Sequence, residues 1–147
     1  MNDTLRTLIA DKGNRVLSIE PTAMVIDAVR RMNDNGIGAL LVTRGASPVG
    51  IFTERDILRR VVARGLDPVT TPLGEVMTRE IVVVGPSVTV GEAMAIITAK
   101  RIRHLPVVEN GKLLGLVSSG DLTRWVSRGR ENEIQQLIEF ITGKYPG

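Results

Sequence analysis

The chain has 147 residues, a length that fits one compact domain or two very small ones. Hydrophobic residues make up 43% of it and aromatic residues only 3%, so the core must consist of Val, Ile, Leu and Ala, which favours an α/β class. The net charge of +3 comes from scattered basic residues, cysteine is absent and histidine occurs once, which argues against nucleic-acid binding, disulfides and Cys- or His-pair metal sites.

The N-terminal segment, residues 1–11, carries charges within its apolar pattern and has no signal-peptide core. No uninterrupted apolar stretch approaches about 18 residues, the length needed to span a membrane as a helix. We therefore expect a cytoplasmic protein without a membrane partner.

An internal repeat organises the chain. A shift of 65 residues aligns positions 16–57 with 81–122 without a gap. Eight pairs are identical: Pro21/Pro86, Val25/Val90, Ala28/Ala93, Ile37/Ile102, Leu40/Leu105, Val42/Val107, Gly50/Gly115 and Asp56/Asp121. We therefore divide the sequence into a first copy at 4–70, a second copy at 72–129 and a C-terminal helix and tail at 130–147.

The predicted elements follow one order in both copies. In the first copy they are a strand at 16–19, a helix at 23–35, strands at 40–43 and 49–52, and a helix at 54–64. In the second copy they are a strand at 81–84, a helix at 90–101, strands at 105–108 and 113–117, and a helix at 119–128. Each strand pair brackets turn residues, and Asn110-Gly111 is a strong hairpin signal. One copy is thus β-α-β-β-α.

A copy this small would leave much apolar surface exposed, so the two copies are expected to pack about a pseudo-twofold axis. Residues 4–9 are expected to lead into the first copy and residues 72–78 into the second. Apolar residues Ile134, Leu137, Ile138 and Ile141 predict a terminal helix, stopped by Gly143 and Pro146, that caps the core or docks on another subunit.

The motif G-h-h-[ST]-x-x-D, where h is apolar, occurs at 50–56 and again at 115–121. A hydroxyl residue followed three positions later by an acid is also a helix capping box, and the structural and ligand-binding interpretations can coexist. The repeated motif resembles the cystathionine β-synthase (CBS) domain family, in which paired copies form a regulatory module. The resemblance includes the Leu105-Pro106-Val107 strand, the basic pair Arg103-His104 before it, and the Val76-Met77-Thr78 segment.

The resemblance implies a stand-alone sensor that binds an adenosine nucleotide, such as AMP, ADP, ATP, NAD or S-adenosylmethionine, requires no metal, forms a homodimer and regulates a separate protein that the sequence does not identify. It assigns the ribose hydroxyls to Asp56 and Asp121, and a carboxylate can accept two such hydrogen bonds side by side.

Phosphate contacts are expected from five residues, which are Thr53, Ser118, Arg103, His104 and Arg55. The basic pair occurs in the second copy alone, because Gly38 and Ala39 stand at the matching positions of the first. Two equivalent sites are therefore not expected. A structural histidine and a solvated arginine are the alternative interpretations of the pair.

The adenine base has no aromatic partner among the candidate residues. The resemblance implies that backbone groups and aliphatic walls of the first strand in each copy hold it. The candidates are Val16, Ser18, Ile19, Ile81, Val83 and Val84.

Catalysis is not supported by any motif. The sequence has no phosphate-binding G-x-x-x-x-G-K-[ST] loop, and Gly36-Ile37-Gly38 is only a fragment of a dinucleotide fingerprint. A catalytic triad would depend on His104 as its base. We therefore predict that the chain is not an enzyme, and the remaining alternative is a dimerisation module with degenerate ligand sites.

Overall fold

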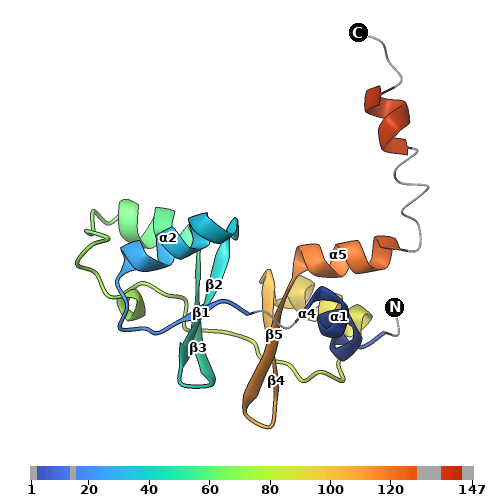
Figure 1. The fold of residues 1–147 in the computed structure, drawn as a ribbon, viewed down its shortest axis with the longest axis horizontal. Coiled ribbons are helices and arrows are strands. Elements are labelled where there is room, and N and C mark those ends of the chain that lie inside the picture. Colours follow the sequence, from blue (N-terminus) through green and yellow to red (C-terminus); the bar gives the residue numbers. More distant parts are fainter. Residues whose placement is uncertain (1–2, 14–15, 129–136, 144–147) are drawn as a thin grey trace.

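Two α/β lobes lie side by side in the computed structural model, which describes residues 3–13, 16–128 and 137–143 (Figure 1). The first lobe contains β1 (Ser18–Ile19), α2 (Val25–Asn35), β2 (Ala39–Arg44), β3 (Ser47–Thr53) and α3 (Glu54–Asp56), which continues as the π-helix η1 (Ile57–Val62). The second contains α4 (Val90–Lys100), β4 (His104–Glu109), β5 (Lys112–Ser118) and α5 (Ser119–Ser127). Two further elements, α1 (Leu5–Lys12) and the 3-10 helix η2 (Leu73–Glu75), precede the lobes in sequence.

The antiparallel hairpins of the two lobes share one register. Val42 pairs with Gly50 in the first lobe and Val107 pairs with Gly115 in the second, and each ladder then shifts by one residue. The second hairpin turns through Asn110 and Gly111, both with positive φ, as that dipeptide predicts. The 65-residue shift therefore describes the fold as well as the sequence, and the predicted α/β class with two repeats is confirmed.

The first strand of each copy is shorter than predicted. β1 has two residues, paired parallel to β2 through Ile19 and Val42. Residues 81–83 form no ladder, and the matching position Val84 makes only a single bridge to Val107. The predicted strand at 81–84 is thus wrong in extent, because Pro106 of β4, whose carbonyl accepts from the Val84 N–H at 3.1 Å, has no backbone N–H to extend the ladder.

The segments that lead into each copy pack in the opposite lobe. Leu5 of α1 belongs to the core of the second lobe, and its N–H donates to the carbonyl of Val88 at 2.8 Å. Leu73 of η2 belongs to the core of the first lobe, and its N–H donates to the carbonyl of Ala23 at 2.8 Å. The two lobes are therefore tied together by exchanged helices, although the sequence boundary near residue 71 separates the copies.

The C-terminal segment ends in η4 (Glu139–Gly143), which lies away from both lobes in Figure 1. Its apolar side chains Phe140 and Ile141 are each 59% exposed, so the expectation that this helix caps the core is wrong for the described part. Ile134 and Pro146 lie outside the described residues. Among the described helices, none combines the length and apolar character needed to cross a membrane.

Candidate functional site

A cleft of about 720 Å³ separates the two lobes. The first lobe contributes the end of β3 and the start of the following helix, and the second contributes the start of β4. The segment between the lobes completes the wall with Thr78, Glu80, Ile81 and Val82. The cleft therefore gathers residues that are far apart in sequence.

Asp56 lines this cleft and is 5% exposed. Its Oδ2 accepts from the Thr53 N–H at 3.0 Å while the Thr53 hydroxyl accepts from the Asp56 N–H at 3.2 Å, which is the predicted capping box. The Thr78 hydroxyl donates to Asp56 Oδ1 at 3.0 Å, and Arg60 Nε is 3.5 Å from the same oxygen. Apart from Arg60, the partners of Asp56 are thus uncharged, and the Thr78 hydroxyl can rotate away from it.

The cleft wall is rich in positive charge. Five arginines line it, which are Arg55, Arg59, Arg60, Arg101 and Arg103, against the three carboxylates Glu54, Asp56 and Glu80. The predicted residues Arg55 and Arg103 thus meet Asp56 in one cavity, although they come from different copies. An anion whose other end carries hydroxyl groups matches this distribution of donors and acceptors.

His104 lines the same cleft and is half-buried. Burial lowers the pKa of His104, the positive charges of Lys12 and Arg103 lower it further, and Asp121 opposes them. The imidazole is therefore mainly neutral near pH 7, so that the positive charge beside it comes from Arg103.

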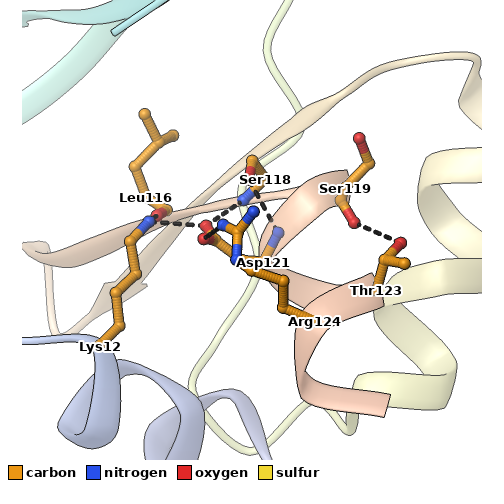
Figure 2. A network of polar contacts seen from close by, with 7 residues as sticks. All are labelled: Lys12, Leu116, Ser118, Ser119, Asp121, Thr123 and Arg124. Atoms are coloured by element: carbon orange, nitrogen blue, oxygen red, sulfur yellow. Dashed lines mark hydrogen bonds and ion pairs between the residues drawn. The ribbon is translucent and has the colours of Figure 1, made fainter. Parts of the chain in front are cut away.

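Asp121 lies in a different environment (Figure 2). It shares the capping-box geometry with Ser118, whose N–H donates to Oδ2 at 2.8 Å. Lys12 Nζ donates to the same Oδ2 at 2.6 Å, and Arg124 Nη2 donates to Oδ1 at 2.6 Å. Burial alone would raise the pKa of Asp121, but the hydrogen bond and charge of Lys12 and the hydrogen bonds with Ser118 outweigh it and lower the pKa.

The predicted base-binding residues are dispersed. Ile81 lines the main cleft, and Val16 lines a smaller cavity of about 160 Å³ near Lys12. Ile19 is buried in the first core, Val84 packs against the second, and Val83 is 44% exposed. The Ser18 carbonyl accepts from Arg31.

Three residues at the carboxylates were missed by the sequence interpretation: Thr78, Arg60 and Lys12. Thr78 closes the Val76-Met77-Thr78 segment quoted for the family resemblance, and Arg60 lies one helical turn after Asp56, so both had a signal. Lys12 had none, because it reaches Asp121 from 109 positions away in sequence. Groups of three or more acidic or histidine side chains able to hold a metal ion do not occur in the part of the chain that the structure describes.

Comparison with known proteins finds the same duplicated domain. The family model described as "CBS domain" matches residues 12–63 and 73–128. The CBS domain-containing protein CBSX3, mitochondrial, from Arabidopsis thaliana is 38% identical over 126 residues, which are 82% of this chain and 61% of that protein. The chain thus spans less than two thirds of that relative's length.

Two solved structures also have this fold. The CBS domain protein PAE2072 from Pyrobaculum aerophilum, complexed with AMP, has 29% identity and a TM-score of 0.70 over 80% of this chain and 88% of that one. The hexameric CBS-CP12 protein from bloom-forming cyanobacteria has 32% identity and a TM-score of 0.73 over 84% of this chain and 71% of that one. With both copies matched and most of its length covered, the chain belongs to the CBS domain family as a tandem pair of CBS domains.

Proposed function

We propose that this chain is a regulatory sensor that binds one adenosine nucleotide in the cleft between its lobes. The observation that supports this most is the meeting of Asp56 with Arg103 in one cavity. In this proposal the Asp56 carboxylate accepts the two ribose hydroxyls, with Thr78 reorienting to make room. The AMP complex of the Pyrobaculum aerophilum protein supports the ligand class.

The phosphate end of the ligand is proposed to lie against Arg103 and Arg55, with Thr53 and His104 as additional partners. Thr53 uses its hydroxyl oxygen as an acceptor in the capping box, so its hydroxyl hydrogen is free to point into the cleft. The base is proposed to lie on the wall formed by Ile81 and Val82, because Ile81 is the one predicted base-binding residue that lines the cleft. Among AMP, ADP, ATP, NAD and S-adenosylmethionine, the nearby arginines favour a phosphorylated ligand.

Substitution of Arg103 and His104 tests the phosphate assignment. Removing the guanidinium deletes charge-assisted hydrogen bonds, so the double variant Arg103→Ala/His104→Ala should weaken AMP binding at least about tenfold, or about 1.4 kcal/mol, in calorimetry. Adenosine, which has no phosphate, should be affected much less.

Two further variants complete the test. Asp56→Asn should weaken AMP and adenosine binding together, and Arg44→Ala, which removes an exposed arginine outside the cleft lining, should change neither. Equal losses of AMP and adenosine in the double variant would contradict the phosphate assignment. If the wild-type chain binds none of the five adenosine-containing ligands, the alternative of an interaction module with degenerate sites is the better description.

The output of the sensor is proposed to be regulation of a separate protein rather than catalysis, and its assembly is proposed to be a homodimer. The cytoplasmic location stays a prediction, which microscopy of the tagged protein would test.

A further inference from the structure

The cleft at Asp56 has a counterpart at Asp121, and the 65-residue shift identifies its parts. Ile81, Val82 and His104 of the main cleft correspond to Val16, Leu17 and Ala39, which line the cavity of about 160 Å³. Asp56, Arg59 and Arg60 correspond to Asp121, Arg124 and Trp125, which line a separate cavity of about 420 Å³. One continuous cleft in one half of the duplication is therefore two cavities in the other.

Lys12 is the residue that divides the counterpart. It lines both of the smaller cavities, and its Nζ donates to the carbonyl of Leu116 at 2.8 Å and to Asp121 Oδ2 at 2.6 Å (Figure 2). Its side chain thus lies across the space between the Leu116 carbonyl and the Asp121 carboxylate, which a ligand in this half would have to reach.

Thr78 makes the equivalent contacts in the open half. Its backbone N–H donates to the carbonyl of Ile51, the counterpart of Leu116, at 2.8 Å, and its hydroxyl donates to Asp56 Oδ1 at 3.0 Å. One neutral residue therefore satisfies in the first half what one lysine ammonium satisfies in the second. The hydroxyl can rotate away from its carboxylate, whereas moving Lys12 breaks a charge-assisted hydrogen bond, which is about twice as strong as a neutral one.

Both oxygens of Asp121 already accept from cations, Oδ2 from Lys12 and Oδ1 from Arg124. A ribose would have to displace these cations. The negative charge of Asp121, which is 9% exposed, would then lose its cationic partners.

We propose that Lys12 is a built-in occupant of the second site, which limits the chain to one nucleotide, bound at Asp56. The inference rests on the proposed nucleotide function of the cleft. It assigns Asp121 to an internal ion pair, and it makes the identity of residue 12 the determinant of whether one or two ligands bind.

The test is the stoichiometry of AMP binding to the full chain, measured by calorimetry and equilibrium dialysis. We expect one AMP per wild-type chain and two per Lys12→Met chain, because the flexible Met side chain cannot donate to Leu116 or Asp121 and is therefore not held across the site. Adding Asp121→Asn to Lys12→Met should restore one. Lys100→Met, which also removes a lysine from the last residue of a helix, should leave one. Lys12→Ala replaces Lys12→Met if the latter does not fold.

A second readout does not depend on nucleotide. The pKa of Asp121, followed through the NMR shift of its carboxyl carbon, should be higher in Lys12→Met than in wild type, because the ammonium that lowers it is gone. Arg124 and His104 remain beside Asp121 in both chains.

The outcomes separate the two proposals. A wild-type chain that binds no AMP, with a Lys12→Met chain that binds one through Asp121, supports the role of Lys12 as occupant of the second site and contradicts the proposed function at Asp56. A wild-type chain with one AMP and a Lys12→Met chain also with one overturns the inference alone. A Lys12→Met chain that binds no more AMP than the wild-type chain overturns the inference, whatever the wild-type chain binds. A Lys12→Met chain that binds less AMP than the wild-type chain would identify Lys12 as a ligand contact and would also overturn the inference.

Discussion

Gly50 and Gly115 explain why the repeated motif begins with glycine. A Cβ at Gly50 would lie 2.8 Å from both Met77 Sδ and the carbonyl oxygen of Thr78. A Cβ at Gly115 would lie 3.1 Å from Cδ1 of Ile9 in α1. In each lobe the glycine therefore admits the exchanged segment against the central hairpin, so a motif recognised for its ligand chemistry also has a packing function.

The two glycines should respond differently to a methyl group. Gly50→Ala meets a backbone oxygen that is held by the Ile51–Thr78 hydrogen bonds, and overpacking of this kind typically costs about 1–3 kcal/mol. Gly115→Ala meets the end of a flexible side chain and should cost less. Urea unfolding of the two variants measures this difference, and a larger loss for Gly115→Ala would contradict it. Because Thr78 holds Asp56, Gly50→Ala should also weaken AMP binding.

At the scale of elements, the exchange of α1 and η2 decides which lobe each helix stabilises. Leu5 and Leu73 are both fully buried, and truncating such a leucine to alanine typically costs about 2–5 kcal/mol. We predict that Leu5→Ala perturbs backbone NMR shifts mainly in the second lobe, near Val90 and Leu105, although it precedes the first copy in sequence. Leu73→Ala should perturb the first lobe, near Val25. Shifts confined to the lobe nearest in sequence would refute the exchange.

The sequence predicts the hairpins and helices well because the repeat doubles every signal. A pattern such as Gly50/Gly115 or Asp56/Asp121 is seen twice, which makes chance agreement improbable. It does not predict the exchange, because residues 4–9 and 72–78 lie outside the gapless alignment and both are apolar enough to fit either core. It also overestimates the strand at 81–84, where Ile81 and Val82 line the cleft and Val84 alone makes a bridge.

The sequence predicts individual residues of the candidate site but does not predict which of them lie together. Asp56 and Arg103 each had a motif, but only the fold shows that they share a cavity. Asp121 had the same motif as Asp56 and differs because a lysine from a distant helix reaches it. Contacts that span a hundred residues leave no periodic or spacing signal in a single sequence.

At the scale of the whole molecule, the duplication is symmetric in its backbone and asymmetric in its surface chemistry. Hairpin register, the capping boxes at Thr53 and Ser118 and core positions repeat, whereas Lys12, four of the five cleft arginines and the exposed helix residues do not. Symmetry in the buried residues maintains the fold, and the differences between the copies lie at the cleft and at exposed helix faces.

The first lobe presents an apolar face that the second lacks. Leu58 and Val62 lie four residues apart on η1 and are 64% and 65% exposed, while Ser127 stands at the position matching Val62. Residues at this spacing lie on one face of a helix, and a second copy of the chain in an isologous contact would cover it. We predict self-association at micromolar concentration, and the hexameric cyanobacterial relative makes dimer and hexamer the two states to distinguish.

Sedimentation of Val62→Glu tests this directly, because a buried, unpaired carboxylate at such a contact is costly and should shift the protein toward monomer. Val62 is not among the residues that line the main cleft, so its replacement should leave AMP binding intact, which Leu58→Glu would not ensure because Leu58 lines it. Val69→Glu is the matched control, since Val69 is 59% exposed in the loop after η1 and off the helical face. Dissociation by Val69→Glu to the same extent, or an unchanged sedimentation coefficient for Val62→Glu, would place the contact elsewhere on the molecule.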